Sequence, residues 1–122
     1  MLRTWWALRS QKRRRNAATP LVVPKPVITS GVLVVSEVNP LWLDALVGFT
    51  FDGTGLPAGT LEVQGFLESD YGNWQSRLTV AVGASGFRDD MVFTSQDAVT
   101  YRMRFVSGTV TGPWSDEVQV TL

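Results

Sequence analysis

The chain has 122 residues, 44% of them hydrophobic, which is enough for one domain with its own core but not for two. It contains no cysteine and no histidine, so disulfides, thiolate metal sites, cysteine nucleophiles and histidine acid–base chemistry are excluded. The net charge is zero, and no apolar run approaches the roughly 18 residues that a membrane-spanning helix needs.

Residues 1–26 form a basic arm that ends in a proline-rich linker. This segment carries seven basic residues and no acid, whereas residues 27–122 carry four arginines and all eleven acids, a net charge of −7. Asymmetry of this kind is typical of interaction tails. The arm residues that we expect to bind a partner are Trp5, Trp6, Arg9, Lys12, Arg13, Arg14 and Arg15.

Four interpretations of the arm are open. As a docking arm, it would place its tryptophans in a partner's pockets and pair its arginines with acids, including those of a neighbouring copy. As a nucleic-acid binder, it would neutralise phosphates and stack on bases. A membrane-surface helix is disfavoured because Arg9 falls among Leu2, Trp5 and Trp6 on a helical wheel. Disorder is disfavoured by two exposed tryptophans. We expect the docking arm, extended or partly helical.

The body, residues 27–122, shows apolar and polar residues in alternation and no helical period. Period two places alternate side chains on opposite faces of a strand. Seven such runs with turn residues between them predict an all-β fold, a seven-stranded antiparallel β-sandwich. The runs span 32–35, 47–51, 61–65, 77–82, 91–94, 99–105 and 117–122.

The last stretch, VTYRMRFVSGTVTGPWSDEVQVTL, resembles the end of a fibronectin type III domain. In that family a tyrosine opens the sixth strand, small and basic residues alternate along it, and a glycine-containing turn with Trp-Ser precedes a short last strand. Phe51 stands where the family's second strand carries a core tryptophan. The resemblance implies a fibronectin type III or immunoglobulin-like sandwich. The matching residues are Tyr101, Arg102, Arg104, Gly112, Trp114, Ser115 and the run 117–122.

The acids of the body do not form a catalytic pattern. Neighbours in an extended chain point to opposite faces, so neither Asp89-Asp90 nor Asp116-Glu117 is the carboxylate dyad of a hydrolase. No calcium loop of the Asp-x-Asp-x-Asp-Gly type occurs. We therefore expect solvated turn acids, no enzymatic activity, no metal and no cofactor.

Two glycine pairs resemble phosphate-binding loops only superficially. Neither Gly53-x-Gly55 nor Gly83-x-x-Gly86 is followed by Lys-Ser or Lys-Thr. Both are predicted to be hairpin turns between neighbouring strands.

Aromatic side chains are the other candidates for a binding site on the body. Trp42, Tyr71 and Trp74 are candidate surface-binding residues, and with Trp114 they could form a sugar-stacking platform. In the alternative interpretation Trp74 and Trp114 cover the sandwich core, because large aromatics bury 150–250 Å² each. The arginines at 102 and 104 alternate outward on one strand, where they would pair with acids or contact a subunit.

A single sandwich with an extended arm resembles the accessory structural proteins of tailed bacteriophage particles, which decorate the head or form neck, tail and baseplate parts. The resemblance implies a non-enzymatic assembly protein located in the virion. Its partners would be other virion structural proteins or further copies of itself, with nucleic acid as a further candidate partner of the arm. The alternative is a carbohydrate- or cell-surface-binding module.

Overall fold

The structure, a computed structural model, describes residues 21–67, 73–93 and 98–122. The described part of the chain is all-β, as predicted, and contains no helix long and apolar enough to cross a membrane. Each of the seven predicted runs corresponds to a strand, and a two-residue strand, β7, is additional. The strands are β1 (Val27–Val35), β2 (Trp42–Thr50), β3 (Thr60–Phe66), β4 (Trp74–Ala81), β5 (Gly86–Phe93), β6 (Ala98–Ser107), β7 (Val110–Thr111) and β8 (Val118–Thr121).

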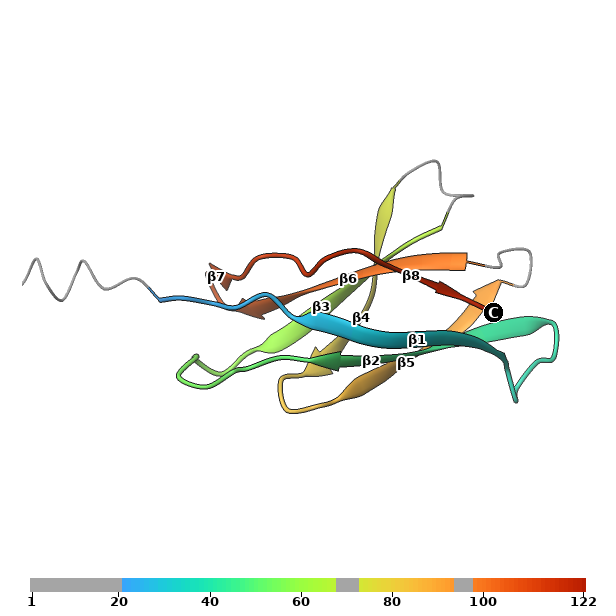
Figure 1. Ribbon diagram of the computed structural model, residues 1–122, viewed down its shortest axis with the longest axis horizontal. Helices are drawn as coiled ribbons and strands as arrows, with labels where there is room; N and C mark the ends of the chain where they lie inside the picture. Colours follow the sequence, from blue (N-terminus) through green and yellow to red (C-terminus); the bar gives the residue numbers. More distant parts are fainter. Residues whose placement is uncertain (1–20, 68–72, 94–97) are drawn as a thin grey trace, which may run out of the picture.

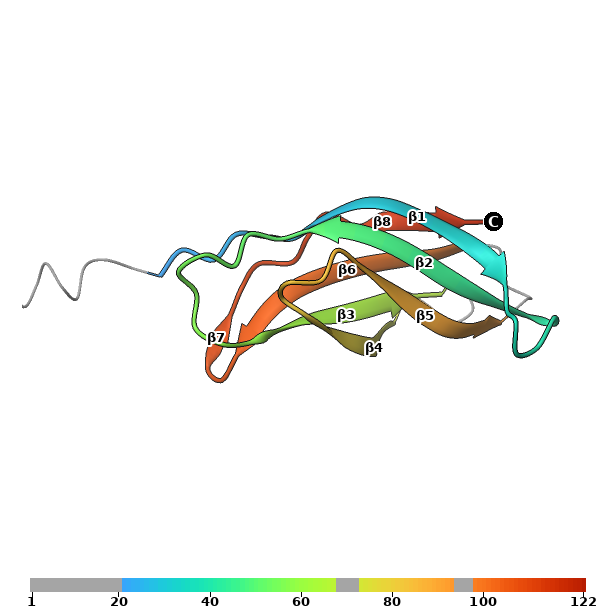
Figure 2. The ribbon, with the colours of Figure 1, turned by 90° about the horizontal axis from the view of Figure 1, so that it is seen from below.

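The strands form two antiparallel sheets that face each other (Figures 1 and 2). The three-stranded sheet has the order β1-β2-β5. The five-stranded sheet has the order β4-β3-β6-β7, and β8 also pairs with β6. Residues 21–26 lie at one end of the molecule, and the C-terminus lies at the other end together with the β1–β2 connection (Figure 1). The fold is therefore the predicted β-sandwich, with the chain entering at one end.

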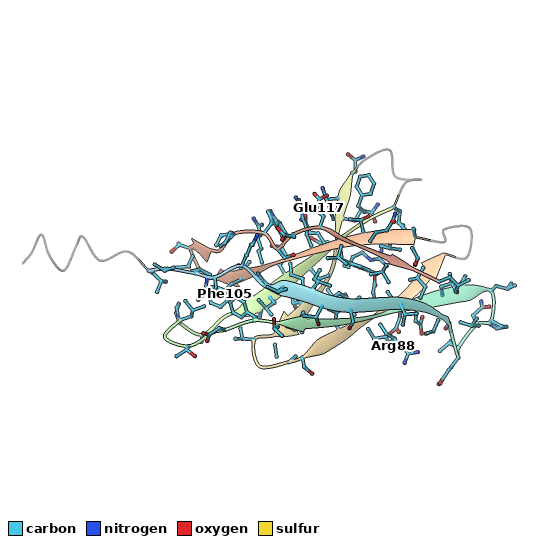
Figure 3. The ribbon with its side chains drawn as sticks, in the orientation of Figure 1. Arg88, Phe105 and Glu117 are labelled. Carbon is cyan, nitrogen blue, oxygen red and sulfur yellow. The ribbon has the colours of Figure 1, made fainter. Side chains whose placement is uncertain are left out.

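The core lies between the sheets and follows the alternation of the sequence. Along β6 the even and odd positions differ: Tyr101, Met103 and Phe105 are fully buried, whereas Arg102 and Arg104 are half-buried on the outer face. Phe105 lies in the layer between the sheets (Figure 3). Burying one such large apolar side chain stabilises the fold by about 1.5–3 kcal/mol.

The end of the proline-rich linker packs onto the sandwich. Pro26 is fully buried, and Val23 packs against the core. A Cβ at Gly112 would lie 2.6 Å from Val23 Cγ1, so glycine is required there for the linker to lie this close. Lys25 Nζ forms an ion pair with Asp116 Oδ1 at 2.8 Å. The arm therefore leaves the body from a fixed point.

The prediction of two hairpin turns is wrong. The connection that contains Gly53 and Gly55 joins β2 to β3, and the connection before Gly86 joins β4 to β5; in both cases the two strands belong to different sheets. The local turn is real, because Leu56 N donates to Gly53 O at 3.1 Å and Gly55 has a φ of 78°. A turn signal ends a strand, but the packing of apolar faces decides which sheet the next strand joins.

Candidate functional site

Three polar clusters stand out on the described residues, and the first is buried between the sheets. Asp89 of β5 has a side chain that is 6% exposed. Its Oδ2 accepts hydrogen bonds from Arg77 Nε at 2.9 Å and from the Tyr101 hydroxyl at 2.6 Å, and its Oδ1 accepts one from Arg77 Nη2 at 3.1 Å. The expectation that Asp89 is a solvated turn acid is therefore wrong. Its neighbour Asp90 is exposed, as expected for opposite faces of a strand.

A β-bulge turns Arg77 toward this cluster. Leu78 pairs with Val63 and Ser76 pairs with Gln64, which leaves Arg77 as the extra residue of β4. A Cβ at Gly65 would lie 3.0 Å from Arg77 Cγ, so the absence of a side chain on β3 makes room for the arginine. The cluster thus joins β4 and β6 of one sheet to β5 of the other.

The surroundings of Tyr101 keep its hydroxyl protonated. Burial raises the pKa of Tyr101 far above its usual value, and the charge of Asp89 and the hydrogen bond to that carboxylate raise it further. A phenol held in this way donates a hydrogen bond and is not a nucleophile at neutral pH. We interpret the cluster as a structural tie between the sheets.

Substitution of Asp89 should destabilise the fold much more than substitution of Asp90. We expect Asp89→Asn to lower the free energy of unfolding by about 3 kcal/mol, because it leaves Arg77 without a counter-charge, and to lower Tm by more than about 10 °C. Asp90→Asn should change the free energy by less than about 0.5 kcal/mol. Urea unfolding of both variants measures the difference, and equal losses would contradict the assignment.

The free energy of unfolding should fall at alkaline pH because of Tyr101. The unfolded chain releases the Tyr101 proton near pH 10, whereas the folded chain keeps it. Above about pH 10 the unfolded state therefore binds fewer protons, and stability should fall by about 1.4 kcal/mol per pH unit. Tyr71→Phe leaves Tyr101 as the only tyrosine, since the chain has two. In this variant tyrosinate absorbance should appear only with unfolding; a reversible titration near pH 10 in the folded protein would contradict the prediction.

The second cluster is a stack of rings and guanidinium groups on the outer face of the five-stranded sheet. The Arg102 Cζ lies 4.2 Å from the ring centre of Trp74 and 4.1 Å from that of Trp114. The Arg104 Cζ lies 4.2 Å from the Trp114 ring. Phe66 packs beside Trp74 with ring centres 5.5 Å apart. Each tryptophan ring therefore lies against at least one arginine of β6.

Hydrogen bonds from the neighbouring strand hold the two arginines in place. Arg102 Nε and Nη2 donate to Gln64 Oε1 at 3.0 and 2.6 Å, and Arg104 Nε donates to Glu62 Oε2 at 2.9 Å. Ser115 fixes the segment that carries Trp114, because its amide donates to Met103 O at 2.7 Å and its hydroxyl accepts from Met103 N at 2.9 Å. Trp74 and Trp114 are half-buried on the outer face of the sheet and are not part of the core between the sheets, and each lies against an arginine of β6.

The stack predicts a difference between two substitutions of Arg102. Arg102→Ala should cost about 2 kcal/mol of stability, since two cation–π contacts of about 0.5–1 kcal/mol each and the bonds to Gln64 are lost. Arg102→Lys should cost about 1 kcal/mol, because lysine keeps the charge but not the planar group. Denaturant unfolding and near-UV circular dichroism report both effects, with Thr79→Ala on the same sheet as the control. A loss below about 0.5 kcal/mol in Arg102→Ala would show that the stack is not stabilising.

The third cluster lies on the outer face of the three-stranded sheet, near the β1–β2 connection. Arg88 Nε and Nη2 donate to Asp44 Oδ2 at 3.0 and 2.8 Å, and Arg88 Nε lies 3.1 Å from Asp90 Oδ1. The hydrogen bond to Asp44 raises the pKa of Arg88, and the charges of Asp44, Asp90 and Glu37 add to this effect. A shallow groove of about 280 Å³ opens beside the arginine. Its lining consists of Ser36, Glu37, Val38, Asp44, Arg88 and Asp90.

Several predicted site residues lie outside the described residues. These are Trp5, Trp6, Arg9, Lys12, Arg13, Arg14 and Arg15 of the arm, and Tyr71. Trp42 is half-buried on β2 of the three-stranded sheet, whereas Trp74 begins β4 of the other sheet, so these two do not share a sheet. Among residues 21–67, 73–93 and 98–122 there is no group of three or more acids that could hold a metal ion.

Sequence reasoning missed the two buried acids. Asp44 interrupts the apolar stretch Leu41 to Val47, and Asp89 falls two residues after Phe87 on the inward face of its strand. For Asp89 the available signal was a charge at a position that alternation assigns to the core, whereas alternation places Asp44 on the outer face, and only its apolar neighbours gave a signal there. No protein-family profile matches the sequence, and a search of curated proteins finds no significant match.

Proposed function

We propose that the protein is a non-enzymatic assembly component of a virus particle, in which the N-terminal arm docks onto a partner and the sandwich projects from it. The partners would be other virion structural proteins or further copies of the chain. We also propose that the body has a fibronectin type III or immunoglobulin-like topology. Both proposals build on the resemblances of the sequence to fibronectin type III domains and to structural proteins of bacteriophage particles.

The strand order supports the topology. In immunoglobulin-like sandwiches the first, second and fifth strands lie in one sheet, and the third, sixth and seventh lie in the other. Here β1, β2 and β5 form one sheet, and β3, β6 and β8 belong to the other, with β4 beside β3 and β7 as an added short strand. Tyr101 lies on β6, where the resemblance expects it.

The junction between arm and body is the observation that carries the docking function. Pro26 is buried and Lys25 pairs with Asp116, so the basic segment leaves the sandwich at a defined place. That place is the end opposite the β1–β2 connection and the C-terminus (Figure 1). The charge of the arm, opposite to that of the body, suits contacts between such subunits.

The clusters of the body support a binding role over catalysis. Asp89 has hydrogen-bond donors on both carboxylate oxygens, and it lies between the sheets, where a substrate does not reach it. The carbohydrate-binding alternative needs tryptophan faces open to a sugar, and Arg102 lies against one face of Trp74 and one face of Trp114. No observation on the described residues favours that alternative.

The test is whether the arm determines incorporation into particles. Virus particles that are produced in their natural host cells and purified by density-gradient sedimentation should contain the full chain. A variant with Trp5→Ala, Trp6→Ala, Arg13→Glu and Arg14→Glu should remain in the soluble fraction with an unchanged Tm, because the anchors and charges of the arm are lost. Absence of the full chain from particles would overturn the virion proposal. Equal incorporation of the variant would overturn the docking role of the arm.

A further inference from the structure

The two outer faces of the sandwich differ in how far their apolar side chains are covered by other side chains. On the five-stranded sheet the ring and guanidinium stack covers its own tryptophans. The three-stranded sheet instead presents apolar side chains to solvent: Val32 is 43% exposed and Leu46 is 38% exposed. These two residues are direct partners across β1 and β2, and Leu46 is the partner of Arg88 across β2 and β5. Val32 and Leu46 therefore form a short exposed apolar row across the sheet, and this row ends at Arg88, the basic residue of the groove.

The β1–β2 connection extends this surface in a fixed conformation. The Ser36 hydroxyl accepts a hydrogen bond from Val38 N at 3.2 Å, and Ser36 N donates to Trp42 O at 2.9 Å. Asn39 Oδ1 accepts from Leu41 N at 3.0 Å. The turn nevertheless leaves Val38 88% exposed. Val38 therefore adds an exposed apolar side chain to this end of the three-stranded sheet.

We name this surface the turn-end patch. It combines apolar area with negative charge, because Asp90 and Glu37 lie beside Arg88, whose own charge is already paired with the buried Asp44. Figure 3 shows Arg88 on the outer side of the molecule, away from Glu117 on the opposite side. The patch consists of Val32, Glu37, Val38, Asp44, Leu46, Arg88 and Asp90.

We propose that the turn-end patch of one copy binds the N-terminal arm of a second copy, so that the chains associate head to tail. The inference rests on the docking role of the arm proposed above and names its receiving surface. The arm offers the complementary chemistry, two adjacent tryptophans followed by the run Lys12 to Arg15. Tryptophan and arginine are the residues that most often dominate binding at interfaces. The apolar row would receive the rings, and the acids would pair with the basic run.

The reach of the arm favours a second copy over the same body. Lys12, the far end of the basic run, precedes residue 21 by nine residues, a span of at most about 32 Å. The patch acids lie beyond β1, whose nine residues cover about 30 Å, and residues 21–26 lead away from β1 in the opposite direction (Figures 1 and 2). The basic run therefore falls short of Glu37 and Asp90 of its own chain. The length of the arm sets no such limit on contact with a neighbouring copy that is placed end to end.

A head-to-tail contact uses two different surfaces, so a pair of bound copies keeps one free arm and one free patch. Such heterologous contacts form rings when the rotation closes and open filaments when it does not. This property suits a component that is added repeatedly along a shell or a tube. It also allows the two surfaces to be disabled in separate molecules.

The experiment is light scattering of the full chain and three full-length variants over a concentration series. The patch variant is Glu37→Lys with Asp90→Lys. The control is Asp52→Lys with Glu117→Lys, which also reverses one exposed aspartate and one exposed glutamate, neither of which belongs to the patch or to the arm junction. The arm variant is the one described for the particle test. Circular dichroism and Tm confirm that each variant is folded.

We expect the full chain and the control to associate, and the patch and arm variants to associate at least about tenfold more weakly. Salt should weaken association, because the Debye length falls from about 10 Å at 0.1 M to about 3 Å at 1 M. A mixture of the patch and arm variants should form a species of two chains, each 13.5 kDa, since one supplies the arm and the other the patch.

Two results would overturn the inference. If the arm variant is monomeric and the patch variant associates like the full chain, the arm docks elsewhere, and its docking role stands. If the full chain is monomeric throughout, the chains do not bind one another, and the particle test alone decides the docking role. In that case, protease protection of the arm that is lost in the patch variant would place the arm on its own body.

Discussion

A carboxylate enclosed between two sheets constrains the rest of this structure. Asp89 cannot be buried as an anion without donors, because transfer of an isolated charge out of water is costly. Arg77 and Tyr101 supply the donors, and each comes from a different strand of the opposite sheet. The apolar core would allow the sheets to shift against each other, whereas this bidentate contact fixes β5 in relation to β4 and β6.

The outer faces of the two sheets differ in how their polar and apolar side chains are arranged. On the five-stranded sheet, planar guanidinium groups stack on tryptophan rings and are held by Gln64 and Glu62, so polar and apolar groups satisfy one another. On the three-stranded sheet, Leu46 lies beside the ion pair of Asp44 and Arg88 and stays in contact with water. A face with exposed apolar area and unbalanced charge is the one that gains most from a partner.

The junction at Pro26 connects this asymmetry to assembly. It fixes residues 21–26 at one end of the molecule, whereas the β1–β2 connection lies at the other end (Figure 1). Separation of complementary surfaces along one molecule favours contacts between molecules over contacts within one. In the head-to-tail association that we propose, the sandwich is the spacer between the arm and the turn-end patch, and the chemistry of each surface comes from short stretches of the sequence.

Much of this architecture was determined by the sequence alone. Period-two alternation defined the strands and the inward side chains of β6, and the division of charge marked the arm. Other features were decided by tertiary structure, because they depend on groups far apart in the chain. The bulge at Arg77 reverses the face that alternation assigns to it, and only the space above Gly65 and the carboxylate of Asp89 make that reversal favourable. The turns at Gly55 and before Gly86 carry the same local signal as hairpins, yet they cross between sheets, since the burial of apolar faces is a property of the whole fold.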